Sequence, residues 1–134
     1  SAHTMHAVVT EVTVQTVPFA SGDGEEPWDL FSGPDLFYEA YGPDGSLLHA
    51  SDVAHDVRPR DLPVALDGGF TVEPSGPYVL RLLDDDLTGE EVVGRLVLDA
   101  ERLVNEGRKS ALPASICLED QGTTVHVSLT WKEV

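Results

Sequence analysis

Short runs of alternating apolar and polar residues constrain the fold more than any other feature of this sequence. In the clearest run, Val125, Val127, Leu129 and Trp131 alternate with Thr124, His126, Ser128 and Thr130. Successive side chains of a β-strand point to opposite faces, so this run predicts a strand with one buried and one hydrated face. Clusters of Gly, Pro and Asp separate such runs along the chain. The pattern predicts an all-β fold, a single eight-stranded antiparallel β-sandwich.

The expected strands cover residues 8–17, 35–41, 47–57, 63–73, 77–83, 92–98, 115–118 and 123–131. Residues 42–45 are predicted to form a turn, because Pro43 fixes φ and Gly45 supplies a left-handed position. A β-bulge is expected at Gly68-Gly69. Residues 99–109 are the one helical candidate, expected to run for at most two turns and to stop at Gly107.

The composition fits one globular domain. The chain has 134 residues, of which 41% are hydrophobic, and a chain of about 150 residues buries roughly two-thirds of its exposable surface. Residues 1–4 precede Met5, the only methionine, and are interpreted as a remnant of an expression tag, which leaves 5–134 as a single domain. The single cysteine, Cys117, excludes an internal disulfide framework. No apolar run approaches the roughly 20 residues that span a bilayer.

The charge of the chain is strongly negative and unevenly placed. Eight Lys and Arg against 24 Asp and Glu give a net charge of −16, which argues against nucleic-acid binding and against docking on anionic lipid by charge alone. Two segments, 19–35 and 84–91, hold ten carboxylates and no Lys or Arg. If the fold brings both segments to one end, their repulsion favours a bound cation, and calcium accepts six to eight oxygen ligands.

Two segments also match a known family in sequence and spacing. The first reads Trp28-Asp29-Leu30-Phe31-Ser32-Gly33-Pro34-Asp35-Leu36-Phe37-Tyr38-Glu39-Ala40-Tyr41. It resembles the first calcium loop of C2 domains, in which an aspartate and five further residues precede an Asp-Pro-Tyr-Val-like strand start. The second reads Val79-Leu80-Arg81-Leu82-Leu83-Asp84-Asp85-Asp86, then Glu91-Val92-Val93-Gly94. It resembles the third loop of that family, with its apolar strand, Asp-x-Asp and acid-x-x-Gly.

Some positions depart from the family pattern. Leu36-Phe37-Tyr38 replaces the usual Pro-Tyr-Val, and Glu91 stands where an aspartate is usual. The loop before Glu91 is one residue shorter than the common form. The lysine-rich strand surface of the family is missing, since only Arg58 and Arg60 lie near the corresponding strand.

The resemblance implies a C2-like Greek-key β-sandwich that binds calcium. The implied metal ligands are Asp29, Asp35, Asp84, Asp86 and Glu91, and Asp85 is expected to point away from the metal. Leu30, Phe31 and Leu87 are the expected contacts to a membrane or a partner. The function predicted is a calcium-binding module that docks on phospholipid head groups or a protein partner. The alternative is a metal-free protein–protein interaction module whose acidity reflects adaptation to high salt.

No catalytic motif accompanies these loops. His49 and His55 are six residues apart on one expected strand, a separation of about 20 Å that excludes a shared metal. His126 falls on the polar face of the last strand. Gly-x-Ser-x-Gly, His-Glu-x-x-His and phosphate-binding glycine loops do not occur in the sequence. We therefore predict a binding module and not an enzyme.

Overall fold

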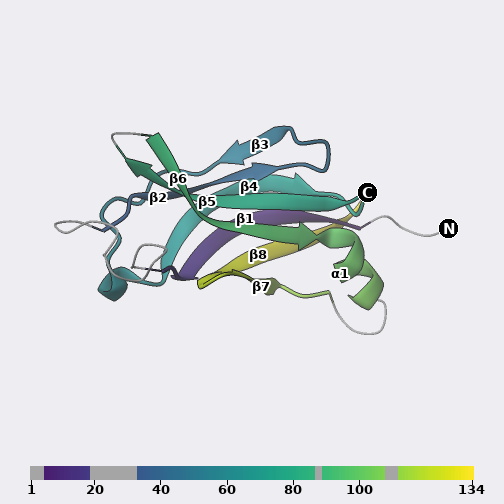
Figure 1. The fold of residues 1–134 in the computed structure, drawn as a ribbon. Coiled ribbons are helices and arrows are strands. Elements are labelled where there is room, and N and C mark those ends of the chain that lie inside the picture. The colour runs from purple at the N-terminus through teal and green to yellow at the C-terminus, as the bar shows by residue number, and fades with distance from the viewer. Residues whose placement is uncertain (1–4, 19–32, 87–88, 108–111) are drawn as a thin grey trace.

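The fold is a β-sandwich, seen in a computed structural model that describes residues 5–18, 33–86, 89–107 and 112–134. Within these residues, eight strands form two antiparallel four-stranded sheets, ordered β4-β1-β8-β7 and β3-β2-β5-β6 (Figure 1). The strands are β1 (Met5–Thr16), β2 (Leu36–Tyr41), β3 (Leu47–Ala50), β4 (Val64–Val72), β5 (Pro77–Asp86), β6 (Gly89–Asp99), β7 (Ser115–Asp120) and β8 (Thr123–Glu133). The all-β prediction is confirmed.

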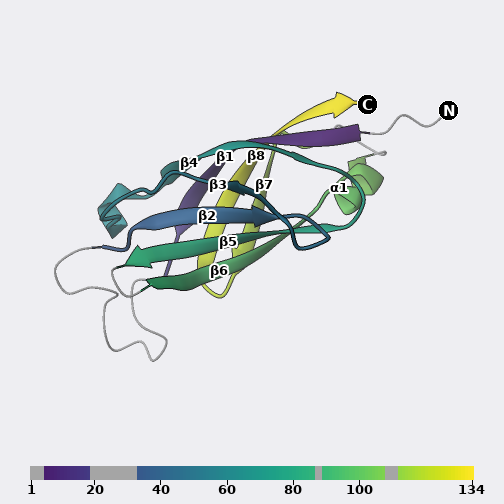
Figure 2. The same cartoon turned by 90° about the horizontal axis from the view of Figure 1, so that it is seen from above.

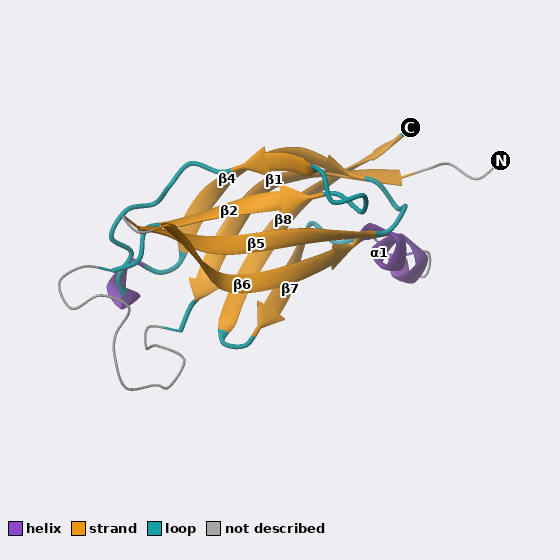
Figure 3. Ribbon diagram, turned by 45° about the horizontal axis from the view of Figure 1, so that its top comes forward, coloured by secondary structure: helices purple, strands orange, loops and turns teal. Residues whose placement is uncertain are grey.

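The core lies between the two sheets and follows the alternation seen in the sequence. On β8, Val125 and Val127 are fully buried while His126 is exposed. Tyr38 on β2 and Leu80 on β5 are equally buried from the opposite sheet. Burying one such apolar side chain contributes about 1.5–3 kcal/mol, so the paired inner faces hold the two layers together. Figure 3 shows the two layers and the helix α1 (Ala100–Gly107) at one end of the sandwich.

Several local predictions are confirmed. Gly45 has a φ of +84° and closes the turn at 42–45 through its N–H to Gly42 O. On β1, Thr10 lies opposite both Gly68 and Gly69, because Val9 pairs with Phe70 and Glu11 with Asp67. This is the expected bulge. The helix α1 has two turns, and its first turn is capped by Asp99, whose Oδ1 accepts the Arg102 N–H at 3.2 Å.

The third strand is shorter than predicted. It ends at Ala50 and not at residue 57, so His49 and His55 do not share a strand. Ser51 Oγ accepts the Tyr38 N–H, and the Asp52 N–H then donates to Asp67 Oδ1 at 2.7 Å. Because Asp67 belongs to β4, this bond interrupts the ladder with β2, which the chain contacts again only at an isolated bridge between Ala54 and Leu36.

The second acidic segment is mostly strand and not loop. β5 runs to Asp86 and β6 begins at Gly89, so the ladder continues through Asp84 and Glu91. Aspartate and glutamate have low strand propensity, yet these residues pair with one another and continue the ladder that the apolar parts of β5 and β6 begin. The prediction of a loop over 84–91 was wrong.

The two ends of the sandwich differ in what they carry. The end of β5 and the starts of β2 and β6 lie at the same end as the 3₁₀ helix η1 (Pro59–Asp61) (Figures 1 and 2). Met5 pairs with Glu133 at the opposite end, where α1 lies. Within the described residues, neither helix is long and apolar enough to cross a lipid bilayer.

Candidate functional site

Two of the predicted ligands meet at the η1 end of the sandwich. Leu36 pairs with Asp84, which places the first residue of β2 beside the acidic end of β5. The Asp35 N–H donates to Asp84 Oδ1 at 2.9 Å, and the Asp85 N–H donates to Asp35 O at 2.8 Å. Residues 49 positions apart in sequence are thereby held together.

Asp84 and Asp85 point in opposite directions. Asp84 is only 8% exposed and lies on the inner face of its strand, in line with Leu82 and Leu80. Asp85 is exposed on the other face, as strand alternation requires. Asp84 is therefore the acidic side chain of this pair that faces Asp35, in agreement with the expectation that Asp85 points away.

The segment from His55 to Val57 holds Asp35 from the other side. The Asp56 N–H donates to Asp35 Oδ1 at 2.8 Å, and the Val57 N–H donates to Pro34 O at 2.9 Å. Leu36 and Ala54 exchange two backbone hydrogen bonds of 2.8 Å next to them. These bonds fix both the backbone and the carboxylate of Asp35 before any ligand binds.

Gly33 is required by this close approach. A Cβ atom on Gly33 would lie 2.1 Å from Val57 O, which no side chain tolerates. The Gly33 N–H also donates to Asp56 Oδ1. Asp56 thus accepts a hydrogen bond from Gly33 and donates one to Asp35. These two bonds hold the segment around Pro34 from both sides.

Asp56 is kept ionised by its neighbours. The Gly33 amide lowers the pKa of the Asp56 carboxyl below its ordinary value, and the Arg58 guanidinium, whose Nε lies 3.2 Å from Asp56 Oδ1, adds to this effect. Asp56 has a φ of +54°, in the left-handed region that Asp and Asn accept more readily than most residues. Arg58, which the sequence placed near the strand that is lysine-rich in C2 domains, neutralises part of the charge at this end.

His55 also approaches the same carboxylate. Its Nδ1 lies 3.7 Å from Asp35 Oδ1, and its side chain is 75% exposed. The His55 ring therefore lies beside the carboxylate that the Asp56 amide also holds.

Glu91 lies on β6, the strand next to the one that carries Asp84. It stands directly opposite Asp84, and the following rung of the ladder places Glu90 opposite Asp85. Like charges directly across a ladder are destabilising. Among the described side chains, however, no three His, Cys, Asp or Glu come close enough to form a metal-binding group, so Asp35, Asp84 and Glu91 do not complete a site alone.

The remaining predicted contacts cannot be placed. Asp29, Leu30, Phe31 and Leu87 lie outside the described residues, and Asp86 is described only as the last residue of β5.

Sequence reasoning missed His55 and Asp56. Both were assigned to a strand that ends at Ala50. The available signal was the broken alternation after that point, where Ser51-Asp52 and His55-Asp56 form polar pairs that a half-buried strand does not favour.

Comparison with solved structures finds a likeness in fold. The chain is similar to a solved C2 domain protein from Ramazzottius varieornatus, with 16% sequence identity, 97% of this chain and 89% of that chain covered, and a TM-score of 0.48. No protein-family model matches the chain, and no curated protein matches it.

Proposed function

We propose that this protein is a calcium-binding C2-like module whose ions are held at the η1 end of the sandwich. The observation that supports this most is the bond from the Asp35 N–H to Asp84 Oδ1, because it joins the two acidic segments at one point. The ligand set of the proposal is Asp29, Asp35, Asp84, Asp86 and Glu91.

The chemistry of the described donors fits calcium. Asp35, Asp84 and Glu91 offer only carboxylate oxygens, the hard ligands that calcium prefers over nitrogen or sulfur. A carboxylate has about four lone-pair sites, so the hydrogen bonds to Asp35 and Asp84 orient these groups without exhausting them. The ion would neutralise the negative charges of β5 and β6, where Asp84 stands opposite Glu91.

The chain's own residues prepare the site for an ion. Asp56 fixes one oxygen of Asp35, and the Asp35 amide fixes one oxygen of Asp84. Binding to carboxylates that are already oriented loses less conformational entropy. In this proposal Asp56 is a positioning residue and not a ligand.

Docking on phospholipid or on a protein partner is the second part of the proposal. A bound ion makes the acidic end less negative and can bridge to a phosphate, while Leu30, Phe31 and Leu87 would supply apolar contacts. The role is one of binding, without catalysis.

A metal-free interaction module is the rival function. It is favoured by the Arg58–Asp56 pair, which already neutralises part of the acidic end, and by the absence of a three-ligand group among the described side chains. In that case the acidic surface itself would be the binding feature.

A thermal melt with and without calcium tests the proposal. Calcium at 100 times its dissociation constant adds about 2.7 kcal/mol of stability, which raises the Tm of a domain of this size by several degrees. Asp84→Asn should remove at least half of that rise, while the Asn side chain still accepts the Asp35 N–H.

Asp85→Asn is the matched control. It removes the same charge from the neighbouring residue, which is exposed on the other face, and should leave the calcium-induced rise unchanged. A Tm that calcium does not move, or a rise that both variants lower equally, contradicts the proposal. Sedimentation with vesicles of phosphatidylserine and phosphatidylcholine then tests lipid docking, which fails if calcium brings no protein into the pellet.

A further inference from the structure

The two sheets are tied together along one side for only part of its length. β6 and β7 are the neighbouring edge strands on that side (Figure 3). The Arg95 N–H on β6 donates to Asp120 Oδ2 at 2.9 Å, and Thr123 Oγ1 donates to Val93 O at 2.9 Å. Side chains of the β7–β8 hairpin therefore supply hydrogen-bond partners to the backbone of β6 at Val93 and Arg95, which lie on its free edge.

Beyond Arg95 the two edges enclose a groove that reaches α1. The groove has a volume of about 520 Å³ and is lined mainly by apolar side chains, with Leu98, Leu103, Ile116 and Leu118 among them. Leu98 belongs to the core, and the other three pack partly buried against it. The groove is thus an apolar extension of the core toward solvent.

Backbone groups of both edges face this groove. Val93 O and the Arg95 N–H point away from β5, so by strand alternation the N–H and C=O of Val97 do so too. Ala114 O accepts the Leu129 N–H from β8. Because the backbone N–H and C=O groups of successive residues point to alternate sides of a strand, those of Cys117 point away from β8, toward the open edge. Val97 and Cys117 both line the groove. An extended chain laid in it would meet strand-type donors and acceptors.

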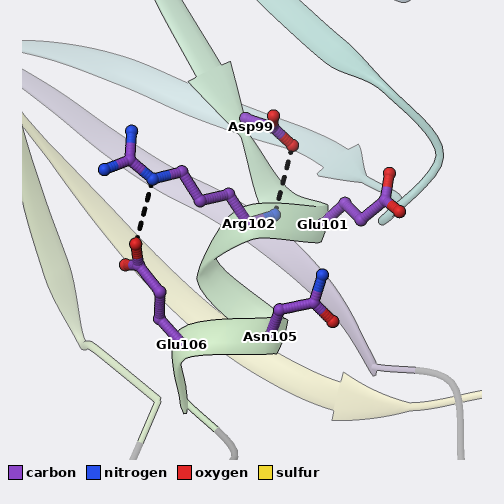
Figure 4. Close-up of a pocket in the computed structure, with 5 residues that line it drawn as sticks. All are labelled: Asp99, Glu101, Arg102, Asn105 and Glu106. Atoms are coloured by element: carbon purple, nitrogen blue, oxygen red, sulfur yellow. Dashed lines mark hydrogen bonds and ion pairs between the residues drawn. The ribbon is translucent and has the colours of Figure 1, made fainter.

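The described charges around the groove are mostly negative. Asp99 and Glu106 line the groove at its α1 end. Glu101 lies on the same helix, where the Nε of Arg102 donates to Glu106 Oε1 at 2.9 Å (Figure 4). Glu119 is exposed on β7 at the other end. A cationic occupant is therefore attracted here and an anionic one repelled.

We propose that this groove docks an extended peptide segment in which basic side chains alternate with apolar ones. The apolar side chains enter the groove, the basic ones meet the acidic rim, and the peptide backbone pairs with the open edge at Val97 or Cys117. A second copy of this chain suits the groove poorly, because each copy carries a net charge of −16.

Titration of the ¹⁵N-labelled protein with a blocked heptapeptide of sequence Lys-Val-Lys-Val-Lys-Val-Lys tests this. We expect the amide NMR signals of β7, of α1 and of the part of β6 beyond Arg95 to shift with added peptide until the shifts saturate. Hydrogen exchange should become slower at the amide of Val97 or Cys117. The same peptide N-methylated at alternate residues should bind at least about tenfold more weakly, because it cannot form the strand pairing.

Two charge reversals complete the design. Glu106→Lys should weaken binding about three- to tenfold. Glu11→Lys changes the net charge equally but lies on β1, at an exposed position away from the groove, and should weaken binding less than twofold. Both residues are exposed, so neither change disturbs the core.

The proposal is overturned if binding does not saturate at millimolar peptide, or if the shifts spread over the whole acidic surface. It is also overturned if both variants weaken binding equally, or if a heptapeptide with Glu in place of each Lys binds equally well. Shifts at β6 and β7 that depend on protein concentration without peptide would also overturn it, and would assign the groove to a second copy of the chain.

Discussion

Asp56 does more at the acidic end than its exposed position suggests. Its amide holds Asp35, its carboxylate accepts the Gly33 N–H, and its left-handed backbone directs both groups toward the start of β2. An aspartate supplies all three functions because its short side chain accepts local hydrogen bonds and tolerates positive φ.

The lowered pKa of Asp56 makes a prediction about acid stability. A carboxyl whose pKa is lower in the folded protein stabilises the fold above its unfolded pKa of about 3.8, and loses this contribution as the pH falls through the folded value. Asp56→Asn keeps the backbone preference and the acceptor for Gly33 but cannot titrate. In urea titrations, the variant should be less stable than the wild type at pH 6, and the difference should shrink below pH 4.

A difference that stays constant from pH 6 to pH 3 contradicts this account, because it would assign the effect to shape and not to charge. Asp61→Asn offers a comparison at another exposed aspartate of the same end.

Single residues were predicted unevenly from the sequence. Asp35 and Asp84 were predicted as ligands from the resemblance of their segments to C2-domain loops. His55 and Asp56 were not, because their contact with Asp35 depends on where β3 ends. That end is set by the bonds of Ser51 to β2 and of Asp52 to β4. The broken alternation after Ala50 indicates the end of the strand but not these partners.

Three elements are linked by one group of polar and aromatic side chains opposite the peptide groove. Tyr38 on β2 donates its hydroxyl to Asp67 O on β4 at 2.7 Å. His49 on β3 contacts the rings of both Tyr38 and Phe70, and its Nε2 lies 3.2 Å from Asp67 Oδ2. Burial raises the pKa of the Tyr38 hydroxyl, and the Asp67 charge raises it further, so this phenol stays a hydrogen-bond donor at alkaline pH. The group joins the edges of both sheets.

Tyr38→Phe tests the contribution of that link. Removing one buried hydrogen bond costs about 0.5–1.5 kcal/mol, and urea denaturation measures it. Tyr41→Phe is the matched control, because the Tyr41 hydroxyl bonds Glu39 Oε1 on the outer face of the same strand at 2.8 Å. That variant should change stability by less than about 0.5 kcal/mol. Equal losses in the two variants would mean that the link between the sheets adds nothing.

Elements were predictable where alternation persists. β8 and β4 show clear period-two burial, and the sequence placed both within two residues of their ends. β5 and β6 run beyond their predicted ends because acidic residues continue a ladder that apolar neighbours began. β3 is shorter because the Asp52 N–H bonds the Asp67 side chain on β4 and interrupts its ladder with β2. Both differences are tertiary effects that override local propensity.

The whole molecule carries far more acid than base, and the sandwich must fold against that repulsion. Raising NaCl from about 0.01 M to 1 M shortens the Debye length from roughly 30 Å to 3 Å. We expect the Tm to rise by several degrees over this range, since screening weakens repulsion among exposed carboxylates. Differential scanning fluorimetry at several salt concentrations measures it.

KCl should act as NaCl does if screening is the cause. Millimolar calcium should add a further rise at constant ionic strength only if ions bind specifically, which separates the proposed function from its rival. A Tm that falls with salt contradicts the charge argument.

At this scale the sandwich was predicted from the number and spacing of short alternating runs. The meeting of the two acidic segments at one end was predicted from the resemblance to C2 domains, and the contact between Asp35 and Asp84 agrees with it. The groove beside α1 was not foreseen, because it depends on how far two edge strands separate, a distance that is not encoded in either strand alone.

The pairing of Met5 with Glu133 has a practical consequence. Since the ends of β1 and β8 lie side by side, a short linker can join them, and new ends can be opened at the exposed turn around Gly45. A second domain fused at Met5 or Glu133 would lie at the α1 end, and would leave Asp35 and Asp84 unobstructed at the opposite end of the sandwich (Figure 1).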